Sequence, residues 1–168
     1  ALRQFCPART AHAITDIVPA DLVQMGKKLV LLDVDNTLLH WRSEDIPEST
    51  FLWVQAARDA GLELCILATT RHPERLERLS KKLNVPFLRG KFKPSRQMYL
   101  QALEKFQVSA EEAIMIGDQI FTDVWGSNRT QIDAILVAQM SPRDFVGTKV
   151  SRFGERLLRP RLNKAIIE

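Results

Sequence analysis

Two acidic side chains directly follow an apolar run near the start of the chain. The run is Leu29-Val30-Leu31-Leu32, and Asp33 and Asp35 come after it with one residue between them. A short apolar run predicts a buried strand, and open α/β sheets bind ligands at the carboxyl ends of their strands. Two carboxylates this close repel each other unless a cation neutralises them. The pattern therefore predicts a metal site in which one carboxylate could attack phosphorus.

Three more polar clusters follow predicted strand ends further along the chain. Thr69-Thr70 closes the run 64–68, Lys93-Pro94 opens a helix after a short third strand, and the segment 117–123 follows the run 113–116. Because the carboxyl ends of parallel strands lie along one edge of a sheet, we expect all of these side chains on the same rim as Asp33.

Strands and helices alternate along the chain. This alternation predicts a parallel sheet with right-handed crossovers. We therefore expect an α/β fold: a three-layer α/β/α sandwich around a central, mostly parallel sheet, forming a single domain over residues 1–168. The expected strands are 28–34, 62–68, 85–88, 113–116 and 134–138, and the expected helices are 47–60, 73–83, 94–106 and 122–129.

The net charge of +4 is unevenly distributed over the 168 residues. Residues 1–142 carry 17 basic and 17 acidic side chains, so the excess belongs to a basic C-terminal tail that starts at about residue 143. Such a tail suggests an acidic partner, and a solvated helix face is the alternative. The basic residues of the tail are Arg143, Lys149, Arg152, Arg156, Arg159, Arg161 and Lys164.

The remaining composition argues against several classes of protein. Cys6 and Cys65 give no disulfide framework, so we expect a reducing compartment and an inert Cys65 in the core. No apolar stretch approaches the roughly 18 residues of a spanning helix. The three histidines, His12, His40 and His72, lack the spaced partners of a zinc site. We expect a cytoplasmic protein, or one inside an organelle if a targeting segment was removed.

The ordered set of motifs resembles the haloacid dehalogenase superfamily of phosphatases. That superfamily has a strand followed by Asp-x-Asp-x-Thr, a strand ending in Thr or Ser, a Lys, and then Gly-Asp-x-x-x-x-Asp. This chain supplies Asp33 to Thr37, Thr69, Lys93 and the segment 117–123 in that order. Each motif alone is a weak signal, whereas the ordered set on strand ends is a strong one.

Further motifs resemble a narrower, capless branch, the YqeG-type group, which is similar to phosphatidylglycerophosphate phosphatases. They are Gly117-Asp118-Gln119-Ile120-Phe121-Thr122-Asp123-Val124 and Gly126-Ser127-Asn128-Arg129. Two departures stand out. Lys91-Phe92-Lys93-Pro94 replaces Arg-x-Lys-Pro, and Thr69-Thr70-Arg71 replaces Ser-Asn-Asn.

The resemblance implies a role for each motif. Asp33 would be the nucleophile that forms an aspartyl-phosphate, and Asp35 the general acid and then base. Thr69 and Lys93 would contact the transferring phosphoryl group. The structural alternatives are a cap or turn for the Asp pair and a plain strand end for Thr69. Lys91 competes with Lys93.

The resemblance also implies Mg²⁺ as the cofactor, because the site is made of hard oxygen ligands. The expected metal site comprises Asp33, the backbone carbonyl of Asp35, Asp118 and Asp123. Asp123 could instead hold waters, orient Lys93 or serve as a helix N-terminal charge. Candidate substrate contacts are Asn36, Thr70, Arg71 and Arg129, the two arginines having surface salt bridges as their alternative.

The short gaps between the motifs leave no room for a cap domain, so an open active site is expected. Asp35 and Thr69 are separated by 33 residues, and Thr69 and Lys93 by 23. An open site suits a phosphate displayed on a large partner. The expected activity is dephosphorylation of phosphatidylglycerophosphate to phosphatidylglycerol at a membrane surface, with Trp41 either touching substrate or bilayer or simply packing.

Two other functions stay open at this point. One is a soluble phosphatase for a small metabolite or a nucleic-acid end, and the other is a non-catalytic module that binds RNA or protein. As partner we expect an anionic lipid headgroup and no nucleic acid, while an oligomer stays possible.

Overall fold

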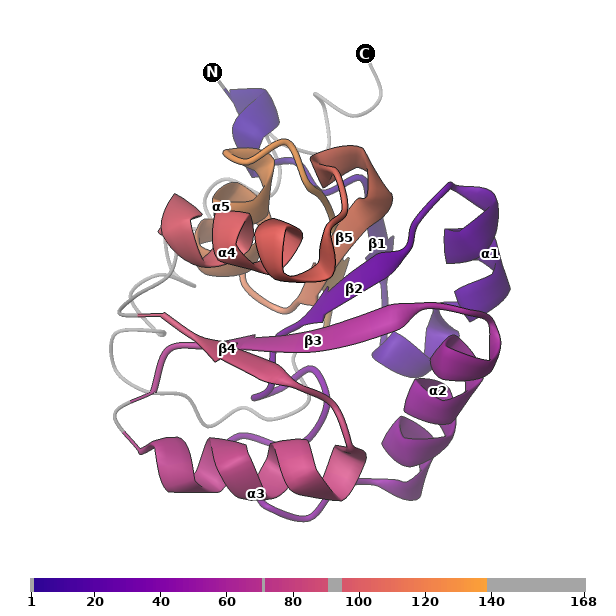
Figure 1. Cartoon of the computed structure of the whole chain (residues 1–168), viewed down its shortest axis with the longest axis vertical. Helices are drawn as coiled ribbons and strands as arrows, with labels where there is room; N and C mark the ends of the chain where they lie inside the picture. The colour runs from indigo at the N-terminus through magenta and orange to yellow at the C-terminus, as the bar shows by residue number, and fades with distance from the viewer. Residues whose placement is uncertain (1, 71, 91–94, 139–168) are drawn as a thin grey trace.

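Six parallel strands form the central sheet of the computed structural model, which describes residues 2–70, 72–90 and 95–138 (Figure 1). Their order is β1-β6-β5-β2-β3-β4, and every pair of neighbours is parallel. The predicted α/β fold with a central parallel sheet is therefore confirmed. The strands are β1 (Arg9–Ala11), β2 (Leu29–Leu32), β3 (Glu63–Ala68), β4 (Phe87–Arg89), β5 (Ala113–Gly117) and β6 (Asp133–Val137).

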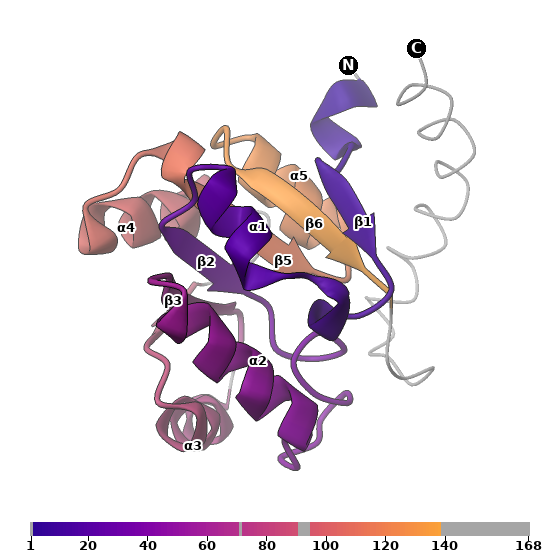
Figure 2. The ribbon, with the colours of Figure 1, turned by 90° about the vertical axis from the view of Figure 1, so that its right-hand side faces the viewer.

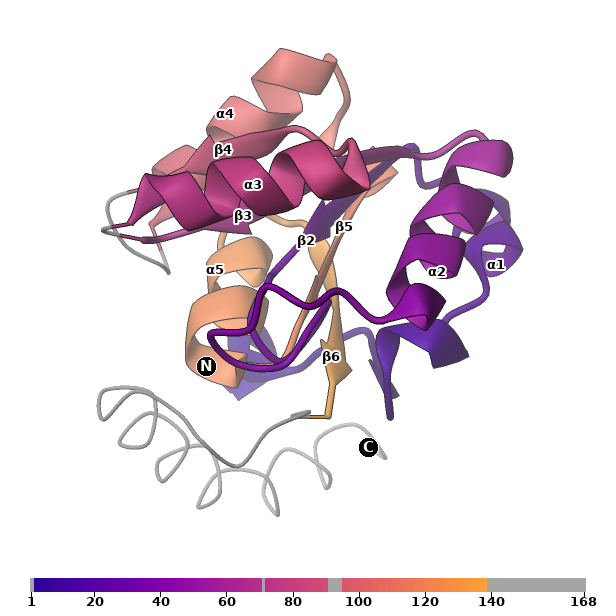
Figure 3. The ribbon, with the colours of Figure 1, turned by 90° about the horizontal axis from the view of Figure 1, so that it is seen from below.

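Helices cover both faces of the sheet. Residues that alternate along a strand point to opposite faces, so Val30 and Leu32 pack with α1, α2 and α3, whereas Leu29 and Leu31 pack with α4 and the segment around α5. Figure 3 shows α2 and α5 on opposite sides of β2, β5 and β6. The helices are α1 (Pro19–Gln24), α2 (Glu48–Asp59), α3 (Pro73–Leu83), α4 (Arg96–Phe106) and α5 (Trp125–Asn128).

The apolar runs of the sequence follow from this three-layer arrangement. All four residues of β2 are buried, as are all five of β5, because a sheet covered on both faces buries every side chain of its central strands. β3 and β4 lie between α3 and α4 in Figure 1, and α1 and α2 lie side by side in Figure 2.

Helix α3 matches its predicted range of 73–83. Pro73 starts it, since proline has no N–H to leave unpaired in the first turn. Asn84 ends it in the left-handed conformation, with a φ of 52°. Leu76, Leu79 and Leu83 bury its apolar face, so the charged residues of this helix lie on the other side.

The structure contains a strand and an α-helix near the N-terminus that the sequence did not predict. β1 pairs with β6 at the edge of the sheet, and α1 follows it. β1 has only three residues, and Arg9 and Thr10 are exposed, so no apolar pattern marks it. α1 has six residues and buries only Leu22. The helix is therefore too short to show the helical spacing of apolar residues.

The predicted helix 122–129 is only partly correct. A one-turn π-helix, η4 (Ile120–Val124), precedes the short α5, so the helical segment begins earlier than expected and opens with a wider turn. The segment Ser109–Glu112 forms a capped 3-10 turn, η3 (Ala110–Glu112), in which the Ser109 N–H donates to Glu112 Oε1 at 3.0 Å.

Cys65 lies in the core of β3, as predicted. Burial raises the pKa of its thiol to about 11. A raised pKa keeps the thiol protonated at neutral pH, and the thiol form is a poor nucleophile.

Two buried hydrogen bonds fix α2 to the segments around it. Thr50 Oγ1 donates to the carbonyl of Leu38 at 2.7 Å, and Trp53 Nε1 donates to the carbonyl of Ile17 at 2.8 Å. Leu38 belongs to the loop that follows Asp35. The start of α2 therefore supports the segment that carries the first acidic pair.

Thr50→Val should lower the free energy of unfolding by about 1–3 kcal/mol, because it leaves the buried Leu38 carbonyl without this partner. Ser49→Ala, one residue earlier at an exposed position, should change it by less than about 0.5 kcal/mol. Urea denaturation of the two variants tests this, and equal midpoints would contradict it.

Candidate active site

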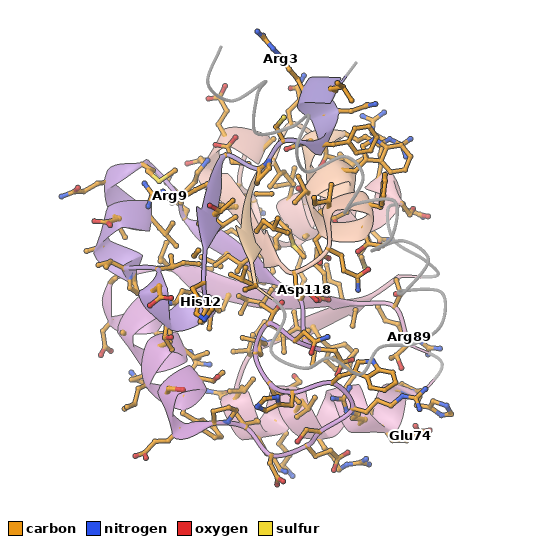
Figure 4. The ribbon with its side chains drawn as sticks, turned by 180° about the vertical axis from the view of Figure 1, so that it is seen from behind. Arg3, Arg9, His12, Glu74, Arg89 and Asp118 are labelled. Atoms are coloured by element: carbon orange, nitrogen blue, oxygen red, sulfur yellow. The ribbon has the colours of Figure 1, made fainter. Side chains whose placement is uncertain are left out.

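The register of the sheet brings the acidic motifs together. Leu32 pairs with Ile66 on one side and with Ile116 on the other. Asp33 comes next, and its N–H donates to the Ile116 carbonyl at 3.0 Å. As a result Asp33 lies at the strand edge from which Asp118 also emerges, and Asp118 occupies the middle of the molecule in Figure 4.

Three carboxylates converge at this edge. Asp33, Asp118 and Asp123 each place one carboxylate oxygen within 4.8 Å of the other two. Asp118 and Asp123 are each 1% exposed, and Asp33 is half-buried. Buried charges of one sign require cationic compensation, and carboxylate oxygens are ligands that hard divalent cations prefer. The three side chains therefore fit a divalent cation.

Asp123 reaches the cluster through the wide turn of η4. The Val124 N–H donates to the Gln119 carbonyl at 3.2 Å, and Asp123 Oδ2 accepts from the Gln119 N–H at 3.2 Å. The carboxylate therefore folds back over the end of β5. A Cβ on Gly117 would lie 2.3 Å from Asp123 Oδ2, so this position has no room for a side chain.

The other side of the wide turn is held by two hydroxyl groups. Tyr99 Oη donates to the Thr122 carbonyl at 3.1 Å, and Ser127 Oγ donates to the Asp123 carbonyl at 2.7 Å. Tyr99 is fully buried in α4. The backbone of Asp123 is thus fixed from the core, which orients its carboxylate toward Asp118.

The N-terminal segment η1 (Leu2–Phe5) supports the same turn from outside. The Phe5 ring lies 5.5 Å from the rings of both Phe121 and Trp125. Asn128 Nδ2 donates to the carbonyls of Gln4 and Cys6, each at 2.9 Å. No local pattern in the sequence indicates this contact, because its partners are more than 110 residues apart.

A cavity of about 800 Å³ opens beside the acidic cluster. Of the predicted site residues, it brings together Asp33, Asp35, Asn36, Thr69 and Thr70. Lys93 and Arg71 lie outside the described residues, so their predicted roles stay predictions. The remaining lining residues are Val34, Trp41, Ala68, His72, Arg75, Leu76, Leu79, Arg89, Gly90, Gln119 and Thr122.

The structure shows what surrounds Asn36 and Arg129, two of the predicted substrate contacts. Asn36 is 2% exposed and adopts a φ of 63°, so it forms a turn in which its N–H donates to the Leu39 carbonyl at 2.8 Å. Asparagine tolerates this left-handed conformation. Arg129 is not among the cavity residues. Its guanidinium lies over the Trp125 ring, 5.0 Å from the ring centre.

Sequence reasoning missed the basic side chains of the cavity. Arg75 Nη2 donates to Asp35 Oδ1 at 2.8 Å, and Arg75 Nη1 donates to Asp35 Oδ2 at 3.2 Å. Arg89, toward the edge of the molecule in Figure 4, donates from Nε to the Thr70 carbonyl at 2.9 Å. Arg75 belongs to a helix dense in charged residues, where no sequence signal distinguishes it from its neighbours.

Parts of the chain match two families of known proteins. Residues 30–90 match the haloacid dehalogenase-like hydrolase family, and residues 92–141 match the HAD-hydrolase-like family. The probable phosphatase YqeG of Bacillus subtilis is 28% identical over 152 residues, which cover 90% of this chain and 88% of that protein.

Solved structures show the same fold at low sequence identity. A HAD phosphatase from Thermococcus onnurineus superposes with a TM-score of 0.58 at 17% identity, covering 71% of this chain and 90% of the other. The cobalt-bound deoxy-D-mannose-octulosonate 8-phosphate phosphatase of Haemophilus influenzae gives 0.51 at 20% identity, covering 68% and 80%. Taken with the ordered motifs and the convergent acids, the two family matches and the match to YqeG support a phosphatase of the haloacid dehalogenase superfamily that resembles YqeG.

Proposed function

We propose that this protein is a Mg²⁺-dependent phosphomonoesterase that works through an aspartyl-phosphate on Asp33. The observation that carries the proposal is the convergence of Asp33, Asp118 and Asp123 within 4.8 Å beside an open cavity. Asp33 belongs to both the acidic cluster and the cavity lining, so a phosphate in the cavity can reach it.

In the first half of the reaction, a carboxylate oxygen of Asp33 attacks phosphorus and the bond to the ester oxygen breaks. Asp35, in the same cavity wall, gives a proton to the departing alkoxide, which leaves as an alcohol. In the second half, water attacks the phosphorus of the aspartyl-phosphate and gives its proton to Asp35. Inorganic phosphate leaves, and both side chains return to their starting states.

Mg²⁺ would be held by Asp33, Asp118 and the backbone carbonyl of Asp35, and it would neutralise the charge between the phosphate and the acids. Asp123, whose carboxylate lies within 4.8 Å of those of Asp33 and Asp118, would hold waters bound to the metal or orient Lys93. Thr69, at the exposed rim of the cavity, would donate a hydrogen bond to the phosphoryl oxygens. Lys93 is proposed for the same group on the sequence motif alone.

We further propose that the substrate is a phosphate group displayed on a large anionic partner, with phosphatidylglycerophosphate as the first candidate. The protein would then bind peripherally to a membrane. Residues 36–68 form a loop, α2 and β3, and residues 72–90 form α3 and β4, which supports a capless, open site. Thr69, His72 and Arg89 on the cavity wall are exposed.

Two exposed apolar side chains support contact with a bilayer. Val18 is 52% exposed and Leu52 is 64% exposed, and the neighbouring bond from Trp53 to Ile17 holds their two segments together. Exposed apolar side chains combined with basic residues are typical of proteins that bind at a membrane interface. In this sequence the C-terminal tail supplies the basic residues. Within residues 2–70, 72–90 and 95–138, no helix combines the length and apolar character needed to cross a bilayer.

The first test concerns the nucleophile and the metal. Asp33→Asn should lower kcat by about a thousandfold or more, because an amide cannot form the acyl phosphate. A chelator should abolish wild-type activity, and added Mg²⁺ should restore it. Phosphate release is measured on lipid and soluble phosphomonoesters. Chelator-resistant turnover would remove the metal assignment, and a full cellular phenotype in Asp33→Asn would favour a binding module.

The second test concerns the tight contact at the end of β5. Gly117→Ala should weaken Mg²⁺ affinity by about 10–100-fold, because the new methyl group displaces the Asp123 carboxylate. Titration calorimetry with Mg²⁺ measures the effect. Ile116→Val, one residue earlier in the core, should cost about 0.5–1.5 kcal/mol of stability and leave metal affinity intact. Similar affinities for both variants would argue against this geometry.

The third test separates a lipid substrate from a soluble one. Leu52→Glu should reduce phosphate release from anionic vesicles by about tenfold or more, because it removes an apolar side chain from the bilayer contact. Turnover of a soluble ester should stay unchanged. Gln55→Glu adds the same charge on the same helix and serves as the control. Equal effects of the two variants, or good soluble turnover without vesicle binding, would favour the soluble phosphatase.

A further inference from the structure

We infer that Arg75 is a positioning residue for Asp35, an inference that rests on the proposed acid-base role of Asp35. Arg75 comes from α3, 40 residues beyond Asp35, and the fold brings its guanidinium into the wall of the cavity. No motif of the superfamily assignment includes this residue. Its contacts fix both the carboxylate of Asp35 and the loop beside it.

Three donors converge on the Asp35 carboxylate. Arg75 Nη2 and the Arg42 backbone N–H both donate to Oδ1, each at 2.8 Å, and Arg75 Nη1 donates to Oδ2 at 3.2 Å. Bonds to both oxygens from one planar group fix the rotation of the carboxylate about its last torsion. A single hydrogen bond would leave that rotation free.

The guanidinium is itself held in place. Arg75 Nε donates to the Ser43 carbonyl at 3.1 Å, and the side chain of Arg75 is only 24% exposed. Leu76 and Leu79, which follow it in α3, are 3% and 1% exposed and anchor the helix in the core. One side chain therefore connects a rigid helix, the acid-base carboxylate and the loop 36–47.

The loop conformation fits the same purpose. Arg42 adopts a φ of 57°, a left-handed conformation that is unfavourable for a residue with a side chain. In this conformation its N–H points to Asp35 Oδ1. Its own guanidinium lies 4.5 Å from the centre of the Trp41 ring, and Trp41 lines the cavity. The bonds from Arg75 to Asp35 and Ser43 therefore help to hold the loop that forms this wall of the cavity.

Arg78 provides a matched control on the same helix. Arg78 Nε donates to Glu44 Oε1 at 3.0 Å, so it also connects α3 to the loop. This ion pair is exposed, with 54% and 38% of the two side chains accessible, and it does not touch Asp35. The pairing with Arg78 lowers the pKa of Glu44 from its ordinary value. A loop-fastening effect alone would make Arg75 and Arg78 equivalent.

The experiment compares two esters whose leaving groups differ in their need for a proton. An alkyl phosphate such as glycerol 2-phosphate leaves as an alkoxide and depends on a general acid, whereas p-nitrophenyl phosphate leaves as a stable phenolate. Steady-state kcat and KM are measured with Mg²⁺ for wild type, Arg75→Met, Arg75→Lys, Arg78→Met and Asp35→Asn.

Arg75→Met should lower kcat on the alkyl phosphate by about 10–100-fold and on p-nitrophenyl phosphate by at most about threefold. Asp35→Asn should show the same dependence on the leaving group. Arg75→Lys keeps the charge and the aliphatic stem but cannot bind both oxygens, so it should stay impaired on the alkyl ester. Arg78→Met should match wild type on both.

Three outcomes would overturn the inference. They are equal losses on both esters, a change confined to KM, and a match between Arg75→Met and Arg78→Met. A change confined to KM would make Arg75 a substrate contact. Arg75→Lys preserves the fold more closely, so it decides the question if Arg75→Met unfolds in a thermal scan. A wild-type protein inactive on both esters with Mg²⁺ would instead contradict the proposed function.

Discussion

Repulsion among the carboxylates at the end of β2 and β5 is the constraint on which the rest of the site depends. Asp33, Asp118 and Asp123 hold oxygens within 4.8 Å of one another, and two of the three side chains are almost fully buried. Such an arrangement is unfavourable without cationic partners. The parallel register and the packing behind the strands bring these side chains together, and a divalent cation would offset their repulsion.

That packing comes from parts of the chain far from the motif. Gly117 gives Asp123 the space to fold back, while Tyr99 and Ser127 hold the carbonyls of the wide turn. Phe5 covers the turn from the N-terminal segment. The acidic cluster is therefore supported by α4, by α5 and by η1 together, and rigid support of this kind keeps metal ligands in place.

The loop after β2 depends on a second set of contacts. Asn36 forms its turn in the left-handed conformation, Leu38 near its start accepts a hydrogen bond from Thr50 of α2, and Arg75 of α3 donates to the Ser43 carbonyl. The loop carries Trp41 and contributes one wall of the cavity. The acidic cluster thus lies at the carboxyl edge of the sheet, where strand pairing fixes the geometry, and Asp35, the proposed acid-base residue, lies on a loop that needs its own supports.

The sequence by itself determined the order of the motifs along the chain and the polar residues that follow each predicted strand, because buried strands and the polar residues that end them are local signals. It therefore predicted Asp33, Asp35, Thr69, Thr70 and Asp118 at one rim, and Lys93, Arg71 and the basic tail stay predictions. Only the tertiary structure decided that β1 pairs at the edge of the sheet and that Arg75 holds Asp35. The physical reason is that these contacts join residues 40 or more positions apart, or elements too short and exposed to leave a periodic pattern.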